Sequence, residues 1–276
     1  MQQISLGFKE KAMLNKIIGF IKSYWKTLLF FAIIGLLGGF FTGLYLLDSY
    51  PEDIKQQLIQ EVNSAGLSQI PVDVLLGVVT AIQSAIYGIV FGGLGIIIAK
   101  KIGLWKDEKH ITKKHLIISI VIAFIGGLAL ILPDTLFFSK YSDVIKNSYL
   151  VKPTITYILA SITYGAVIEE VMLRLFLMSL IAYLLNRILK KNCDCSNDAI
   201  LIIANVISAI LFAAGHLPAT LMLIGNSPLI LFRCFLLNGG LGLLFGYLYR
   251  KYGLRYAMIA HGGCHIVSKL IWILFI

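Results

Sequence analysis

Long apolar runs dominate the chain, and short polar segments that carry most of the charge separate them. Seven runs stand out, and each can supply the roughly 20 residues that cross the hydrocarbon core of a bilayer, although the fifth is short. They cover residues 27–47, 74–99, 116–133, 153–187, 199–215, 229–249 and 255–275. The pattern predicts an all-α, polytopic membrane helix bundle in which residues 1–276 form a single transmembrane domain.

The fourth run, residues 153–187, is too long for one perpendicular crossing. It predicts either one long helix, tilted or kinked, or two helices that turn near Glu169. The first choice gives seven transmembrane helices and the second gives eight.

The charges between the runs favour seven helices. Lysines precede the first run, residues 48–73 are acidic, and basic clusters follow the second, fourth and sixth runs. Because positive charge gathers on the cytoplasmic side, seven crossings satisfy every informative loop, whereas eight would place two basic clusters outside. We therefore predict a multi-pass protein of the cell membrane with a cytoplasmic N-terminus and an outer C-terminus. A short amphipathic helix is expected on the outer face at residues 52–65.

The composition agrees with a protein that lives in the bilayer. Hydrophobic residues make up 58% of the chain and charged residues 14%, whereas a soluble domain carries about a quarter charged residues. The net charge of +10 comes from Lys and Arg between the runs, which suits topology and contact with anionic lipid rather than nucleic acid. Cys193 and Cys195 lie in a polar loop, and no second pair completes a metal site.

Glycines recur four residues apart in three of the runs. They occupy Gly35, Gly39 and Gly43, then Gly88 and Gly92, then Gly242 and Gly246. Such spacing lets helix backbones approach closely in lipid. The alternative is a glycine-lined pore.

Three charged side chains interrupt the fourth run, where a charge is costly. Glu170 and Arg174 are four residues apart, so they share a helix face and can neutralise each other. Glu169 diverges from Glu170 by about 100° and has no partner at helical spacing. A buried ion pair that fixes helix packing explains Glu170 and Arg174 but leaves Glu169 unexplained.

Three of the five histidines lie in apolar runs. His216 ends the fifth run, and His261 and His265 share one face of the seventh, whereas His110 and His115 fall in a basic loop and are expected to be solvated. A lone intramembrane histidine is more often a packing residue. Three of them with an unpaired glutamate favour a site, because imidazole and carboxylate move protons near neutral pH and also bind metals.

The motifs resemble those of the CAAX protease and bacteriocin-processing family of glutamate-dependent intramembrane proteases. "EEVMLR" is similar to the family's EExxxR, "FAAGH" to its FxxxH, and "HGGCH" to a third motif in which Asn or Asp follows a His by four residues. The three occur in the family's order on separate runs. The resemblance covers residues 150–270, the expected protease core.

The resemblance implies an intramembrane endopeptidase and assigns roles to the motif residues. Glu169 would be the base that activates water, and Glu170 with Arg174 would support the helix. His216 would hold the water or a metal, and His261 would stabilise the oxyanion or ligate a metal.

His265 stands where the family has Asn or Asp, and it can still donate a hydrogen bond or ligate a metal. A metal site would use Glu169, His216 and His261 as ligands, with zinc as the ion.

The implied substrate is membrane-associated: a prenylated C-terminal peptide, a bacteriocin leader or a membrane-anchored protein. Two other functions stay open, a non-catalytic immunity or scaffold protein of the same fold and a proton-coupled transporter. A transporter would usually show two related halves with interrupted helices, and none is visible.

Glu169 and the three histidines His216, His261 and His265 are expected to converge on one polar cavity, since ionisable groups avoid lipid. Arg233 and Lys269 are expected to extend towards the outer face instead. In straight helices Glu169 and His216 would lie about 27 and 25 Å from the inner ends of their runs, but His261 only about 9 Å. Convergence therefore requires a strong tilt or kink of the fourth helix, or span ends that differ from those predicted.

Overall fold

The structure is a computed structural model that describes residues 8–106, 110–189 and 198–276. The described residues form helices and no strands. The first half contains α1 (Phe8–Ser49), α2 (Glu52–Ser64), α3 (Val72–Lys101), α4 (Lys113–Leu136), the 3-10 turn η1 (Phe138–Lys140) and α5 (Asp143–Ser148). The second half contains α6 (Ile155–Ala160), the π-helical stretches η2 (Ser161–Glu169) and η3 (Val171–Met178), α7 (Ser179–Leu189), α8 (Asp198–Gly215), α9 (Leu217–Leu223), α10 (Pro228–Cys234), the π-helical η4 (Phe235–Gly239), α11 (Gly240–Tyr252) and α12 (Leu254–Phe275).

The predicted polytopic helix bundle is confirmed. Within the described residues, six helical segments are long and apolar enough to cross a membrane: Met13–Ser49, Val72–Lys101, Lys113–Lys140, Asp198–Leu223, Pro228–Tyr252 and Leu254–Phe275. They correspond to six of the seven predicted runs. The amphipathic helix expected at residues 52–65 is α2, which buries none of its residues.

The fourth predicted run is not among these six because it is divided into α6, η2, η3 and α7. These stretches follow one another without a break from Ile155 to Leu189, so the run is one long helix, as the charge pattern predicts, and not two helices that turn near Glu169. Its central part is π-helical over residues 161–169 and 171–178. π-Helical turns are rare, and they occur often at functional sites.

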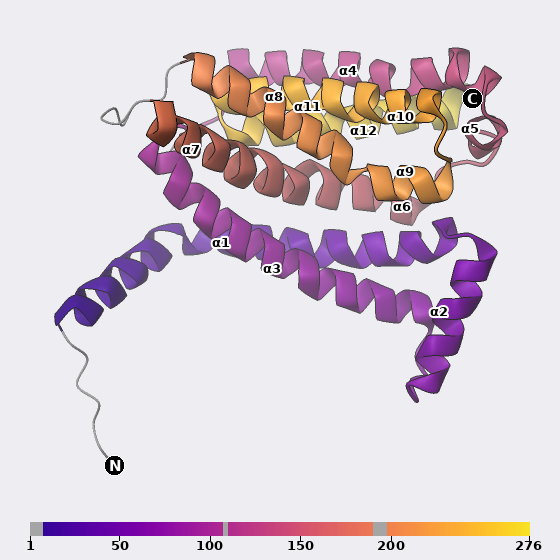
Figure 1. Cartoon of the computed structure of the whole chain (residues 1–276), viewed down its shortest axis with the longest axis horizontal. Helices are drawn as coiled ribbons and strands as arrows, with labels where there is room; N and C mark the ends of the chain where they lie inside the picture. The colour runs from indigo at the N-terminus through magenta and orange to yellow at the C-terminus, as the bar shows by residue number, and fades with distance from the viewer. Residues whose placement is uncertain (1–7, 107–109, 190–197) are drawn as a thin grey trace.

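The long helix lies between two groups of helices (Figure 1). On one side α1 and α3 pack against each other along most of their length. On the other side α4, α8, α11 and α12 form a second group, in which α4 and α12 pair. The long helix contacts α1 and α3 on one side and α8, α11 and α12 on the other, so its polar side chains are enclosed by protein.

Glycines allow the close approach of α1 and α3, as the four-residue spacing predicts. A Cβ atom added at Gly39 would lie 2.3 Å from the backbone O of Thr80, and one at Gly35 would lie 2.6 Å from the backbone O of Ser84. Both distances are far inside van der Waals contact, so only glycine permits this packing.

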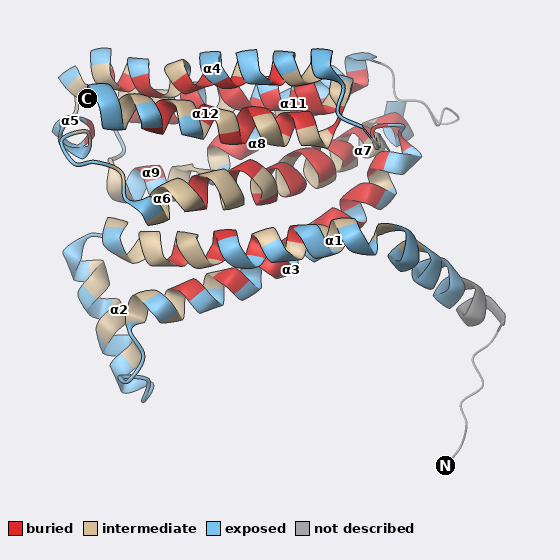
Figure 2. Cartoon of the chain, turned by 180° about the vertical axis from the view of Figure 1, so that it is seen from behind, coloured by how far each residue is buried: buried red, intermediate tan, exposed pale blue. Residues whose placement is uncertain are grey.

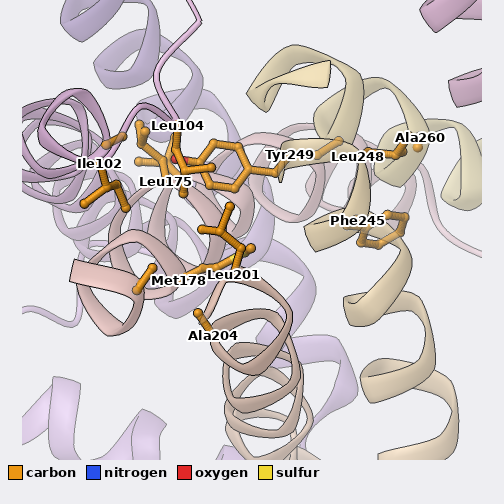
Figure 3. Packing of buried hydrophobic residues seen from close by; sticks show 14 of the residues in the cluster. Ile102, Leu104, Leu175, Met178, Leu201, Ala204, Phe245, Leu248, Tyr249 and Ala260 are labelled. Carbon is orange, nitrogen blue, oxygen red and sulfur yellow. The ribbon is translucent and has the colours of Figure 1, made fainter. Parts of the chain in front are cut away.

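A large apolar cluster fills one end of the bundle. It joins α3, the long helix, α8, α11 and α12, and Figure 3 labels ten of its members: Ile102, Leu104, Leu175, Met178, Leu201, Ala204, Phe245, Leu248, Tyr249 and Ala260. Exposed residues follow the outward faces of the helices (Figure 2), and many of them are large apolar side chains, as expected of surfaces in lipid.

Replacing Gly39 tests the α1–α3 contact. Gly39→Ala would force a methyl group against the backbone of α3, and overpacking of this kind costs about 1–3 kcal/mol. We expect a lower thermal midpoint for the purified protein in detergent. Gly19→Ala is the matched control on the same helix, because nothing lies within 4 Å of its added Cβ. Equal midpoints for the two variants would contradict the close packing.

Candidate functional site

The two adjacent glutamates of the long helix have different surroundings. Glu170 is completely buried, and its Oε1 lies 3.1 Å from Nη1 of Arg174, which is 1% exposed. Glu169 points into a cavity and keeps 20% of its side-chain surface exposed. The helix geometry predicted this division, because residues four apart share a face and adjacent residues do not.

The Arg174 guanidinium is held on several sides. Its Nη2 donates to the backbone O of Gly242 in α11, and its Cζ lies 4.5 Å and 5.5 Å from the ring centroids of Phe212 and Phe245. A Cβ on Gly242 would lie 3.2 Å from the same Nη2, so this glycine leaves room for the arginine. Aromatic faces attract a buried cation, and Arg174 therefore fits as the partner of a buried carboxylate.

His261 of α12 connects the two glutamates. Its Nδ1 lies 2.9 Å from Oε1 of Glu170, and its Nε2 lies 4.0 Å from Oε2 of Glu169. The imidazole stacks on Phe245 with the ring centroids 4.4 Å apart, which fixes its plane. The spacing along the helix predicted only Arg174 as a partner of Glu170. It did not predict His261, because helical spacing carries no information about contacts between helices.

His265, one turn further along α12, also faces the cavity. Its ring centroid lies 5.1 Å from that of His261, and its Nδ1 lies 3.4 Å from Nζ of Lys269. Lys269 is 4% exposed, and its Nζ sits 4.2 Å from the ring centroid of Tyr157. The expectation that Lys269 extends towards the outer face is wrong, because its ammonium group turns inward to the histidine.

His216 follows the last residue of α8. Its Nδ1 lies 2.9 Å from the backbone O of Phe212, and its ring meets the Phe212 ring edge to face. A carbonyl oxygen can only accept, so Nδ1 carries the proton and Nε2 is left as the acceptor of the neutral ring.

One cavity of about 730 Å³ is lined by Glu169, His216, His261 and His265, as the sequence predicts. Gly165 lies one turn before Glu169, and a Cβ there would meet Nε2 of His265 at 3.4 Å and Nε2 of His261 at 3.9 Å. A side chain at this position would occupy the space between the helix and the two imidazoles.

The donor set does not fit the metal site that the sequence left open at Glu169, His216 and His261. Across residues 8–106, 110–189 and 198–276, no three His, Cys, Asp or Glu side chains converge as metal ligands would. Nε2 of His261 and Oε2 of Glu169 lie 4.0 Å apart, and no third His, Cys, Asp or Glu among the described residues lies close enough to join them as a metal ligand.

A second polar cluster, formed by Asp134, Tyr149 and Arg233, lines another part of the same cavity. Arg233 forms an ion pair with Asp134 through two of its nitrogens, and the hydroxyl of Tyr149 donates to Asp134 at 3.0 Å. Burial and the neighbouring Asp134 raise the pKa of Tyr149. Arg233 was expected to extend towards the outer face, and this is wrong because α4 continues past its predicted end and brings a buried carboxylate to it.

His115 also differs from its prediction as a solvated residue. It lies in the first turn of α4, half-buried, with its ring 4.3 Å and 5.3 Å from the ring centroids of Tyr252 and Tyr256. It packs far from the cavity and takes no part in the site. His110 is exposed, as predicted. Cys193 and Cys195 lie outside the described residues.

The long helix reaches the depth of His261 because it extends beyond the bundle. Its Tyr183 already lies beside Lys101, the last residue of α3, with Nζ 5.7 Å from the ring centroid. Ile188 and Leu189, in its last turn, are 73% and 61% exposed. The helix ends at Leu189, two residues past the predicted run, and its π-helical turns, which hold more residues each, shorten the distance between Glu169 and that end.

Removing Arg174 tests whether the buried pair is structural. Arg174→Ala would leave Glu170 as a buried carboxylate without its cation, which costs about 3–5 kcal/mol. We expect a lower thermal midpoint in detergent, with partial recovery of the midpoint in the Arg174→Ala, Glu170→Ala double variant. Activity should not recover in the double variant, because His261 has then lost its Nδ1 partner. An unchanged midpoint in the single variant would contradict the buried pair.

The family comparison agrees with the part of the chain that carries the motifs. Residues 151–267 match the family model of the Rce1-like, type II CAAX prenyl endopeptidases. No curated protein and no solved structure matched the chain in the same comparison. The matched residues include Glu169, Glu170, Arg174 and all three cavity histidines, and they support a CAAX-protease kind of function in a multi-pass membrane protein. The resemblance to the CAAX protease and bacteriocin-processing family is thereby confirmed over residues 151–267, where this chain matches the Rce1-like type II CAAX prenyl endopeptidases.

Proposed function

We propose that this protein is an intramembrane endopeptidase that hydrolyses a peptide bond of a membrane-associated substrate with a water molecule activated by Glu169. The observation that carries the proposal is the contact of one imidazole, His261, with two carboxylates of different character. Glu170 is buried and neutralised by Arg174, whereas Glu169 faces the cavity, and among the described residues no Lys or Arg lies within ion-pair distance of it.

The spacing between Glu169 and His261 suits a water molecule. Their facing atoms are 4.0 Å apart, too far for a direct hydrogen bond, and one oxygen atom can lie about 2.8 Å from both. Because His261 donates its Nδ1 proton to Glu170, its neutral ring presents Nε2 as an acceptor. A water that donates to Glu169 and to Nε2 keeps its lone pairs free for attack. This geometry favours a water-holding role for His261 rather than the oxyanion role that the resemblance implies.

We assign the stabilisation of the oxyanion to His265. With Nζ of Lys269 as the donor, the 3.4 Å contact makes Nδ1 of His265 the acceptor and leaves the ring proton on Nε2. That Nε2–H faces the space beside Gly165. A neutral donor there supplies what the amide of Asn supplies in the family motif, and Lys269 acts as its positioning residue.

The proton steps then balance. Glu169 takes a proton from the water as its oxygen attacks the carbonyl carbon, and the charge that develops on the carbonyl oxygen meets the Nε2–H of His265. When the C–N bond breaks, Glu169 returns that proton to the leaving nitrogen. His216, with Nε2 as an acceptor, can hold a second water or an N–H of the substrate.

No step of this scheme requires a metal, in keeping with the donor set. A non-catalytic immunity or scaffold protein remains the alternative from the sequence. It requires neither a polar cavity nor an unpaired carboxylate within it, and it would keep its biological effect without Glu169.

Substitution of the glutamates separates the base from the structural carboxylate. We expect Glu169→Gln to lower peptide cleavage by about 10²–10⁴-fold, the contribution of a positioned general base, with an unchanged thermal midpoint. Glu170→Gln should lower the midpoint as well as the activity, because it removes a buried charge that pairs with Arg174. Cleavage by purified protein, measured with and without a chelator, is the assay.

Near-wild-type turnover in Glu169→Gln would overturn the assignment of the base. Loss of cleavage on chelation, with recovery on adding zinc, would overturn the metal-free scheme. The wild-type rate is expected to survive chelation.

A double-variant cycle tests the pairing of Lys269 with His265. Lys269→Met removes the group that fixes the tautomer of His265, and we expect kcat to fall about tenfold, since roughly 1.4 kcal/mol of transition-state stabilisation is lost. His265→Asn, which restores the residue of the family motif, should keep most of the activity. In the His265→Asn background, Lys269→Met should then cost little. Equal losses in both backgrounds would contradict the positioning role.

A further inference from the structure

A second cavity, of about 570 Å³, lies at the end of the bundle where α3 and α11 end and α12 begins. It shares no lining residue with the cavity that holds Glu169. Its walls are α1, the segment that follows α3, the end of α11 and the first turns of α12. Because α1 packs chiefly on α3 and α12 chiefly on α4, the cavity lies between two helix pairs (Figure 1).

Two cationic side chains line this cavity, and its described lining residues include no Asp or Glu. They are Lys106 and Arg255, and both are half-buried. The ammonium of Lys106 donates to the backbone O of Lys251, and a Cβ added at Gly253 would lie 3.6 Å from the Cβ of Lys106. The lysine is thus held against the connection between α11 and α12. Two positive charges in a wall without acidic residues favour an anionic ligand.

The rest of the lining is mainly aromatic or apolar. Leu104 and Tyr249, which Figure 3 labels, belong to the buried apolar cluster and form the inner wall. Phe30 also lines the cavity and is 48% exposed, so the cavity reaches the outward face of α1. A ligand bound here therefore borders the surrounding lipid as well as the protein.

The charged and apolar parts of the lining follow the depth order of a bilayer. Both α1 and α12 run into the bundle from this end. At 1.5 Å per residue, Met258 lies about 4.5 Å deeper than Arg255, and Phe30 about 4.5 Å deeper than Thr27. A phospholipid has the same order, since its phosphate lies at the edge of the hydrocarbon core and its acyl chains extend into it.

Aromatic and basic residues around the cavity mark the level of the headgroups. Trp105 meets Tyr24 edge to face with 5.8 Å between the ring centroids, and Nζ of Lys100 donates to the Tyr24 hydroxyl at 2.6 Å. Trp and Tyr are enriched at the interface between membrane and water. Residues 100–115 carry six lysines against two acidic residues, Asp107 and Glu108, which lie outside the described residues. Positive charge therefore prevails at this level.

We propose that this cavity binds one anionic phospholipid of the surrounding membrane. Its phosphate lies between Lys106 and Arg255, and one of its acyl chains lies along Phe30 and Met258. The lipid fills the space between α1 and α12. Since Tyr249 of the inner wall bonds to Ser179 of the long helix at 2.7 Å, the bound lipid also stabilises the helix that carries Glu169. The proposal does not depend on the peptidase function.

Titration of the purified, delipidated full chain in detergent tests this site, with binding followed by native mass spectrometry and by the thermal midpoint. The probes are phosphatidylglycerol, which is anionic, and phosphatidylcholine with the same acyl chains, which has no net charge. We expect phosphatidylglycerol to bind at least tenfold more tightly and to raise the midpoint. Glycerol 3-phosphate, which carries the phosphate without the chains, should leave the midpoint unchanged at the same concentration.

Charge variants locate the phosphate. Lys106→Gln and Arg255→Gln should each weaken phosphatidylglycerol binding about fivefold, the contribution of one basic residue at an anionic surface, and leave phosphatidylcholine binding unchanged. Arg255→Lys keeps the charge and should keep most of the binding. Lys114→Gln is the matched control, because it removes an exposed lysine of the same end that does not line the cavity. The lipid-dependent change in midpoint is compared, so a variant of lower intrinsic stability still reports binding.

Equal affinities for the two phospholipids would overturn the proposal. An equal loss of binding in Lys114→Gln would also overturn it, because it would indicate a general basic surface instead of a defined site. If glycerol 3-phosphate raised the midpoint as much as phosphatidylglycerol, the cavity would belong to a soluble phosphate compound and the lipid assignment would be wrong.

Discussion

The Glu170 carboxylate, shared between Arg174 and His261, is the interaction on which the rest of the site depends. It joins the long helix to α12 through the histidine and, through the arginine's bond to Gly242, to α11. A lone carboxylate or guanidinium in an apolar bundle would be costly, so neither charge can move away from the other. Three helices are therefore held in register by groups that have no alternative partners in lipid.

This register gives two adjacent, chemically identical residues different properties. Glu170 is neutralised and inaccessible, whereas Glu169, turned by about 100°, faces the cavity. The bond from His261 to Glu170 also fixes which imidazole nitrogen faces Glu169. One buried interaction thus sets the helix packing, the orientation of His261 and the freedom of Glu169, which explains why the EE pair has to be contiguous on a single helix.

The sequence predicted the local parts of this arrangement and missed the contacts between helices. The pairing of Glu170 with Arg174 follows from their spacing, and the sharing of one cavity follows from the cost of polar groups in lipid. The bond of His261 to Glu170 and the inward turn of Lys269 depend on the register of α12 against the long helix. No periodicity in one run encodes that register.

The apolar pattern also failed to predict where some helices end. The apolar sequence continues through Ile188 and Leu189, although the helix has by then passed Lys101, the last residue of α3. In α4 the apolar sequence stops before Asp134, although the helix continues and buries this residue, whose charge is paired with Arg233. For Asp134, the partner charge on another helix, and not the composition of α4, decides where the helix continues.

The apolar cluster beside the cavity has a role beyond packing. The proposed hydrolysis needs water at Glu169, but a water-filled path across the whole bundle would let ions and protons cross the membrane. The apolar cluster that begins at Phe245 borders this cavity and offers water no hydrogen-bond partners there. The same cluster joins the long helix, α8, α11 and α12 through buried apolar contacts. Glu169 and His261 therefore lie beside a large buried cluster, and in the proposed mechanism the cavity is left for the substrate.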